Sequence, residues 1–411
     1  MSNLEYFIHT AAAIIVIITL ARLIGTFMVS IKQPRVVGEM IAGVLLGPTL
    51  FTSLCPDISA YLFKDTQAFI YMLGNFGLCF YMFLIGMEID FTKVTPAVRK
   101  QASILSIIAT IVPFFTGCFA GWLFFDQLCL PGIKLSSFMF FMGTAFSIMA
   151  FPMLARILDE KKMIGTTIGS LTMLSSSIQD VVTWILLAFI TAIATTGDVM
   201  KGFITLGGAA IFIAITVFVF KPFLNVLGKK VESQNKISQD QFAIIIVMIL
   251  IAAIITDKIG LYCVFGGFTL GLVMPRGITF QSSVKMKIED ISVVFLLPLF
   301  FSFSGLRTNF LVLSSADLLV PTVSILLLSI VGKYLPVLLG MKACGYSWRE
   351  SSAIGALINS RGLMELIIAN IGLDTHIIDV NTYSILVLIA VVTTLAAMPG
   401  YNASMGKRVV S

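Results

Sequence analysis

Long apolar stretches, separated by short polar connections, follow one another along almost the whole chain. A helix needs roughly 20 apolar residues to cross the hydrocarbon core of a bilayer. Irregular backbone cannot face lipid, because its polar groups would have no hydrogen-bond partners there, so the stretches are expected to be helices. The pattern predicts an all-α polytopic membrane protein with about thirteen transmembrane helices, beginning near Phe7, Val36, Ala68, Gln101, Ser136, Gly165, Gly202, Gln241, Gly260, Ile291, Ala316, Ser351 and Asn381.

The basic residues of the connections alternate strongly between the two sides of the membrane. Of the 27 Lys and Arg residues, nineteen lie in the connections after odd-numbered spans and in the C-terminal tail, and five lie in the other connections. The remaining three, Arg22, Lys333 and Arg361, lie inside spans. Cytoplasmic connections carry the excess of Lys and Arg. We therefore expect an odd number of spans, with the N-terminus outside and the C-terminus in the cytoplasm.

Composition excludes several other kinds of protein. Hydrophobic residues make up 58% of the chain and charged residues only 12%, against roughly 25% charged in soluble domains. The net charge of +6 is spread over short connections, so a nucleic-acid partner is not expected. The six Cys lack C-x-x-C spacing and lie mostly in apolar runs, which indicates neither a disulfide framework nor a zinc site. With only two His, neither histidine catalysis nor a histidine metal site is expected, and no cofactor is expected. The first apolar run, about 7–30, is too long for a signal peptide and is expected to be a retained span.

Two pairs of similar strings suggest an internal repeat. The string around Gly43 and Gly47 resembles that around Gly267 and Gly271, and Gly86 matches Gly305. The matching spans differ by seven, an odd number, so the copies would run in opposite directions, as in many secondary transporters. We predict one transmembrane domain over 1–411, with repeat one at about 7–195, a linking helix at about 202–228, repeat two at about 241–402 and no soluble regulatory domain. The alternative is that these glycines serve helix packing alone.

Asp180 lies well inside the sixth span, about fifteen residues after Gly165. Ionisable groups at this depth are costly and usually mark function. Ser176 and Ser177 precede it by one turn. A carboxylate with hydroxyl neighbours holds either a proton or a dehydrated alkali cation, and competition between the two is the minimal chemistry of exchange. The alternative is an Asp ion-paired for structure only.

Two spans are expected to be broken near their middle, which is a typical sign of a midplane ion site. Pro152 interrupts the fifth span, where Thr144 and Ser147 offer oxygen ligands, and Asn359 offers another in the twelfth. Arg361 and Glu365 are spaced to pair on one helix face, mainly for structure. Lys333 is the expected countercharge of Asp180, or else a structural ion-pair partner. Arg22, Glu39, Glu88 and Asp90 are expected to be anchors or ion pairs.

These motifs together resemble the second family of monovalent cation:proton antiporters, which includes bacterial sodium/proton antiporters, glutathione-gated potassium efflux proteins and plant cation/proton exchangers. The resemblance covers nearly the whole chain and is carried by the strings at 37–48, 83–88, 151–158, 179–180 and 359–366. It implies a sodium/proton antiporter-like fold of thirteen helices, with a dimer-forming panel, a mobile core, two crossed broken helices and an elevator-like cycle.

Carried over to this chain, the resemblance makes Asp180 the ion-binding aspartate and Lys333 the membrane lysine. Gln179 departs from the electrogenic members, which carry Asp there, and looks more like the potassium efflux proteins. The expected function is therefore exchange of K⁺ or Na⁺ for protons by a homodimer. A channel-like potassium efflux protein and a sodium-coupled organic anion symporter remain as alternatives. A membrane enzyme is not expected, because the connections are short and His is nearly absent.

Overall fold

The structure is a computed structural model that describes residues 3–89, 95–160, 162–163, 165–196 and 198–406. All of its regular elements in these ranges are helical, as the apolar pattern predicts. The α-helices are α1 (Asn3–Ser30), α2 (Arg35–Leu46), α3 (Phe51–Leu54), α4 (Pro56–Phe63), α5 (Gln67–Glu88), α6 (Pro96–Leu123), α7 (Phe125–Leu128), α8 (Leu135–Ser147), α9 (Phe151–Glu160), α10 (Thr167–Thr196), α11 (Val199–Ile215), α12 (Lys221–Gln234), α13 (Gln239–Ile259), α14 (Tyr262–Leu272), α15 (Ile278–Asp290), α16 (Leu297–Leu306), α17 (Ala316–Ala343), α18 (Trp348–Ile358), α19 (Leu363–Asp374) and α20 (Val380–Met405). Asp90 lies outside the described residues.

Each of the thirteen predicted spans is occupied by helix, although fewer helices are long enough to cross a membrane by themselves. Within the described ranges, ten helices are long and apolar enough to span a membrane, and the bent pair α18 and α19 makes eleven. The two remaining predicted spans, those beginning near Ser136 and Gly260, are occupied by the shorter apolar helices α8 and α14. The chain is therefore a multi-pass integral membrane protein.

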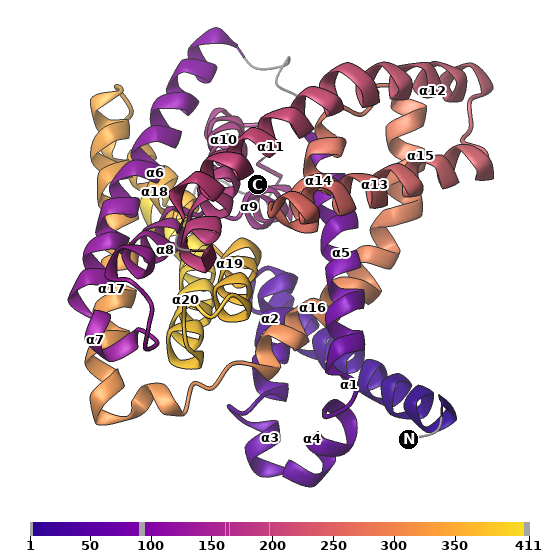
Figure 1. Ribbon diagram of the computed structural model, residues 1–411. Helices are drawn as coiled ribbons and strands as arrows, with labels where there is room; N and C mark the ends of the chain where they lie inside the picture. Colours follow the sequence, from indigo (N-terminus) through magenta and orange to yellow (C-terminus); the bar gives the residue numbers. More distant parts are fainter. Residues whose placement is uncertain (1–2, 90–94, 161, 164, 197, 407–411) are drawn as a thin grey trace.

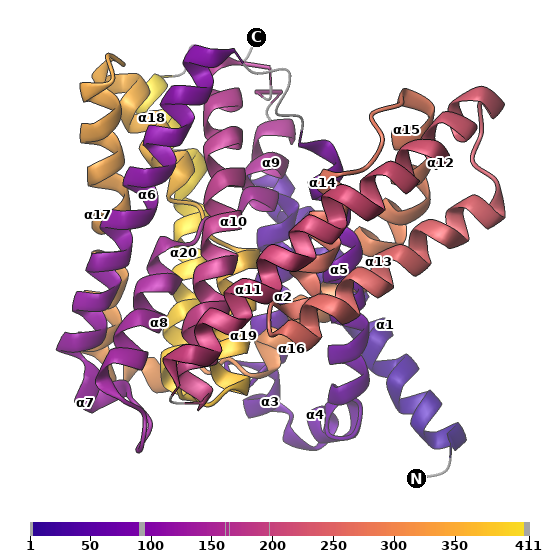
Figure 2. The same cartoon turned by 45° about the horizontal axis from the view of Figure 1, so that its top comes forward.

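The helices form two groups, which lie at the left and right of Figure 1 and Figure 2. We call α1, α2, α5, α13, α14, α15 and α16 the panel, because α2 packs on α1 and α16, and α5 packs on α14 and α16. We call α6, α8, α9, α10, α17, α18, α19 and α20 the core, because α6 packs on α8, α10 and α17, and α18 packs on α17 and α20. The helix formed by α11 and α12 leaves the core beside α10 and ends beside α15.

Glycines bring the panel helices into backbone contact at two places of the same form. A Cβ atom on Gly305 of α16 would lie 1.9 Å from the carbonyl carbon of Gly43 in α2. A Cβ atom on Gly86 of α5 would lie 2.2 Å from the carbonyl oxygen of Phe268 in α14. One contact joins α2 in the first half of the chain to α16 in the second half. The other joins α5 in the first half to α14 in the second half. Only glycine allows backbones to approach so closely.

Both predicted breaks are present in the core. Helix α8 ends at Ser147, residues 148–150 are not helical, and α9 begins at Phe151. The expectation that Pro152 itself interrupts the helix is wrong, because the break precedes it and Pro152 falls in the first turn of α9, where a missing N–H breaks no helical bond. The second break separates α18 from α19, which meet at 41°. There Gly362 has φ +64° and ψ −123°, a conformation that only glycine adopts without strain.

Candidate ion-binding site

Asp180 lies near the middle of α10 with no exposed surface. Neither of its carboxylate oxygens has a hydrogen-bond partner among the described residues, and the hydroxyl of Ser176, one turn earlier, has none either. The carboxylate faces the backbone N–H of Phe151, the first residue of α9, without reaching hydrogen-bond geometry. A helix N-terminus carries partial positive charge and so favours an anion in front of it. Asp180 is thus a buried carboxyl group whose oxygens have no hydrogen-bond partner among the described residues.

Lys333 is fully buried on α17, and its ammonium group binds backbone rather than a carboxylate. Its Nζ atom donates to the carbonyl oxygen of Ser147 at 2.9 Å and to that of Ile148 at 2.5 Å. The expected direct pairing with Asp180 is not seen, since no ion pair joins these two described residues. Lys333 acts on Asp180 electrostatically, while it caps the C-terminal end of α8.

Arg361 binds the same helix end from the second break. Its guanidinium donates to the carbonyl oxygen of Ala145 and to that of Ser329, both at 3.1 Å. The same group lies 3.4 Å from the carboxylate of Glu365, as the i, i+4 spacing predicts. Arg361 and Glu365 are both fully buried. Two cations therefore hold the carbonyl groups at the end of α8, and one acid compensates part of their charge.

The other predicted oxygen ligands differ in how far the protein already uses them. The Thr144 hydroxyl donates to Phe140, and that of Ser177 to Leu174, each within its own helix. The Ser147 hydroxyl lies within hydrogen-bond distance of the carbonyl oxygens of Gly143 and Thr110. Asn359 is buried at the second break, and its Oδ1 has no partner among the described residues. Ser176, Gln179 and Asn359 are thus the neutral candidates whose side-chain oxygens have no partner among the described residues.

Gln179 is held by a polar network that the sequence analysis did not identify. Its side-chain amide nitrogen lies 3.1 Å from the Ser175 hydroxyl, 3.4 Å from the Ser175 carbonyl oxygen and 3.8 Å from the sulfur of Met149. The hydroxyl of Ser106, on α6, in turn reaches Ser175. Ser175 lies next to Ser176 in the sequence and could have been recognised as part of the site. An isolated Ser in a span, such as Ser106, does not indicate a site, because its hydroxyl can bond to its own helix.

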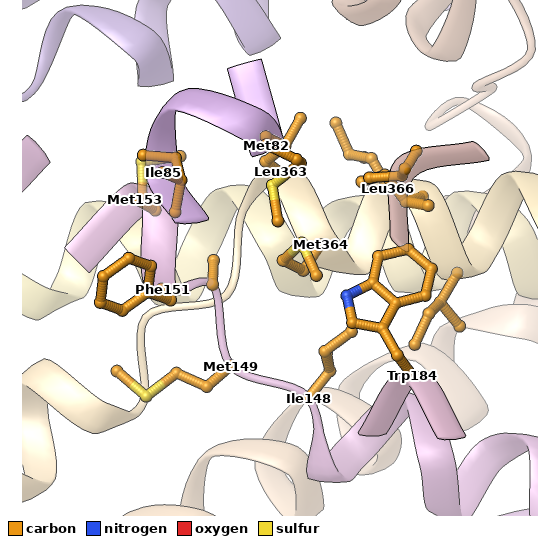
Figure 3. Packing of buried hydrophobic residues seen from close by; sticks show 14 of the residues in the cluster. Met82, Ile85, Ile148, Met149, Phe151, Met153, Trp184, Leu363, Met364 and Leu366 are labelled. Atoms are coloured by element: carbon orange, nitrogen blue, oxygen red, sulfur yellow. The ribbon is translucent and has the colours of Figure 1, made fainter. Parts of the chain in front are cut away.

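Apolar side chains surround the two breaks. Figure 3 shows Ile148 and Met149 on the first break, with Leu363 and Met364 at the start of α19. Met82 of the panel helix α5 belongs to the same buried cluster. At the crossing, a Cβ atom on Gly362 would lie 2.5 Å from the methyl carbon of Met153. This packing keeps the charged groups of the core in a low-dielectric environment, where unpaired charges are costly and interactions between charges are strong.

The charged residues predicted to be anchors lie outside this site. Arg22 of α1 and Glu39 of α2 approach to 3.6 Å within the panel. Glu88, at the end of α5, pairs with Lys285 of α15 at 2.6 Å. Both pairs tie panel helices together.

Comparison with known proteins decides which family this arrangement represents. The family model described as the transmembrane part of sodium/hydrogen exchangers matches residues 11–399. The chain belongs to the sodium/hydrogen exchanger family. It is 36% identical to the Na⁺/H⁺ antiporter NhaS4 of Synechocystis over 390 residues, which cover 94% of this chain and 95% of the relative.

Eukaryotic relatives match over the same region of this chain. It is 34% identical to cation/H⁺ antiporter 19 of Arabidopsis thaliana, covering 94% of this chain and 48% of the relative. It is 30% identical to the K⁺/H⁺ antiporter 1 of Saccharomyces cerevisiae, covering 97% and 46%. The chain thus spans about half the length of these plant and yeast relatives.

A solved structure supports the fold. The sodium proton antiporter MjNhaP1 of Methanocaldococcus jannaschii, determined at pH 8, superposes with a TM-score of 0.68 over 98% of both chains. The sequence identity is 15%, so this likeness concerns the fold alone.

Proposed function

We propose that this chain exchanges a monovalent cation, K⁺ or Na⁺, for protons across a membrane, and that Asp180 binds the cation or the proton in turn. Membership of the sodium/hydrogen exchanger family supports the exchange, as do the names of the relatives, which are Na⁺/H⁺, K⁺/H⁺ and cation/H⁺ antiporters. The observation that carries the role of Asp180 is its burial with two unused carboxylate oxygens.

The surroundings of Asp180 fit a hard cation without a resident cofactor. Alkali cations prefer oxygen ligands, and Ser176, Gln179 and Asn359 each keep a buried oxygen without a partner among the described residues. Thr144, Ser147 and Ser177 would supply further oxygens from their remaining lone pairs. Lys333, Arg361 and Glu365 compensate charge and hold the end of α8 in place. A proton on Asp180 removes the charge that attracts the cation, so the two ions compete.

Alternating access is proposed to arise from two inverted repeats, at about 7–195 and 241–402, joined by a linking helix at about 202–228. The reciprocal glycine contacts, Gly305 on Gly43 and Gly86 on α14, support this symmetry. The excess of Lys and Arg in alternate connections supports an external N-terminus and a cytoplasmic C-terminus. Assembly of two copies through the panel is proposed on the resemblance to dimeric antiporters.

The test uses purified protein in liposomes that hold a pH-sensitive dye and an acidic interior. KCl, NaCl or choline chloride is then added outside. We expect K⁺ or Na⁺, but not choline, to raise the internal pH, and Asp180→Asn to abolish the change. Asp240→Asn, an exposed acid at the start of α13, is the matched control and is expected to behave as the wild type.

Two outcomes would contradict the proposal. If no alkali cation moves protons in the wild type, obligatory exchange is wrong, and a K⁺ flux assay then tests the channel-like alternative. If Asp180→Asn exchanges as fast as the wild type, the ion site lies elsewhere and Asp180 is structural.

A further inference from the structure

The polar network around Gln179 has a defined direction. The carbonyl oxygen of Ser175 can only accept a hydrogen bond, and the thioether of Met149 is likewise an acceptor. Both lie on the nitrogen side of the Gln179 amide, at 3.4 Å and 3.8 Å. The NH₂ group of Gln179 must therefore face these two residues. Its carbonyl oxygen, Oε1, points the other way.

That carbonyl oxygen is buried and unused. Gln179 has no exposed surface, and Oε1 has no hydrogen-bond partner among the described residues. The two oxygens of the adjacent Asp180 share this condition. Leaving such an oxygen unpaired costs about 1–3 kcal/mol, and a bound cation beside Asp180 would remove that cost. A carbonyl oxygen is a good ligand for an alkali cation and carries no proton at any physiological pH.

Two serines hold the amide in this orientation. Ser175 accepts from the Gln179 amide at its hydroxyl, at 3.1 Å. The Ser106 hydroxyl, on the neighbouring helix α6, lies 2.7 Å from the carbonyl oxygen of Ala102 in its own helix, 2.9 Å from the carbonyl oxygen of Ser175 and 3.1 Å from the Ser175 hydroxyl. All three side chains are buried. Ser106 touches neither Gln179 nor Asp180 in any hydrogen bond of the structure, so it acts through Ser175.

We propose that Ser106 and Ser175 are positioning residues that lock the Gln179 carbonyl oxygen toward the cation and thereby set cation affinity and selectivity. The inference rests on the proposed exchange at Asp180. A fixed neutral oxygen discriminates cations by size, because it cannot follow the shorter contacts that Na⁺ requires. An amide free to rotate would adapt to both K⁺ and Na⁺. It would also present its NH₂ group to the cation for part of the time, which weakens binding of either ion.

The test measures exchange in liposomes as a function of the external K⁺ or Na⁺ concentration for Ser175→Ala, Ser106→Ala and the double variant. We expect Ser175→Ala to raise the apparent KM for the preferred cation by about fivefold, the factor that corresponds to one neutral hydrogen bond, with a smaller change in maximal rate. The ratio of the KM values for K⁺ and Na⁺ should move toward one. The double variant should equal Ser175→Ala, because Ser106 acts through Ser175.

Thr172→Val is the matched control. Thr172 is buried on α10 two turns before Gln179, and among the described residues its hydroxyl bonds only to carbonyl groups of its own helix. It should therefore leave KM and selectivity unchanged. A second readout is the rise in melting temperature that K⁺ or Na⁺ produces in detergent, which should need about fivefold more cation in Ser175→Ala. If Ser175→Ala does not fold, the same measurements on Ser106→Ala, which changes a different helix, test the inference.

The inference is overturned if Ser175→Ala and Ser106→Ala change KM no more than Thr172→Val, if they lower the maximal rate alone, or if their effects on KM add. These failures differ from failure of the proposed function. In that case the wild type shows no cation-driven proton movement, or Asp180→Asn still exchanges.

Discussion

Arg307 and Asp374 form an ion pair of 2.6 Å that joins the panel to the core. Arg307 directly follows α16 as its C-cap residue, and Asp374 is the last residue of α19. Arg307 also donates to the side-chain oxygen of Asn370 on α19, at 3.1 Å. Beside this link, a cavity of about 630 Å³ separates α19 from α13 and α14 and is lined in part by Cys263 and Asp374. We expect the link to favour the conformation that contains this cavity.

Breaking the link is expected to disfavour this conformation. Both charged groups are about one-third exposed, so the pair contributes no more than about 1 kcal/mol, or a fivefold shift in population. We expect Arg307→Ala to slow maleimide labelling of Cys263 by about two- to fivefold in a variant whose other cysteines are Ser. Asp374→Ala should do the same, and the charge reversal Arg307→Asp with Asp374→Arg should restore labelling. Unchanged labelling in both single variants would mean that the link does not bias access.

Competition at Asp180 predicts a pH dependence of cation affinity. A proton neutralises the carboxylate, so a lower pH leaves fewer sites able to bind the cation. The apparent KM for the cation should rise by up to about tenfold for each unit of pH on the acid side of the profile and level off on the alkaline side. The measurement is the cation dependence of exchange in liposomes at several symmetrical pH values. A KM that stays constant while only the maximal rate changes would separate the proton site from the cation site.

Lys333 is predicted to stabilise the fold as well as the charge of the site. Lys333→Met leaves the carbonyl oxygens of Ser147 and Ile148 buried without their donor, which should cost about 1–3 kcal/mol for each unsatisfied group. The melting temperature of Lys333→Met in detergent should be clearly lower than that of the wild type. The melting temperature of Lys333→Arg, which keeps a cationic donor, should fall less. Lys201→Met, on the exposed face of α11, serves as control. A melting temperature for Lys333→Met equal to that of the control would argue against the capping role.

The panel glycines predict a matched pair of destabilising substitutions. Gly305→Ala forces α16 away from α2, and Gly86→Ala forces α5 away from α14, because each new Cβ atom would overlap a backbone. Each should cost at least about 1–3 kcal/mol, the usual penalty of overpacking. Gly207→Ala on α11, where a Cβ atom meets nothing within 4 Å, should be tolerated. Thermal stability and monodispersity in detergent measure all three, and an undisturbed Gly305→Ala protein would show that the contact is looser than described.

The sequence predicts the helices and the depth of the charges, because hydrophobic length and the cost of buried charge are local properties. It also indicates both breaks, although the first break lies at residues 148–150, before Pro152. It does not predict what Lys333 binds, because the carbonyl oxygens at the end of α8 become acceptors only once α17 packs against them. For the same reason it does not reveal Ser106 or the Arg307 link, whose partners are 69 and 67 residues away in the chain.

The charged groups of the core have a consequence for the membrane voltage. Asp180, Glu365, Lys333 and Arg361 comprise two negative and two positive groups, and the hydrogen bonds of both cations go to other parts of the core. Moving one elementary charge through a membrane potential of 100 mV involves about 2.3 kcal/mol of work. One bound alkali cation and one bound proton each add a single positive charge to the same set. A one-for-one exchange at this site would therefore move no net charge, and the two concentration gradients alone would drive it.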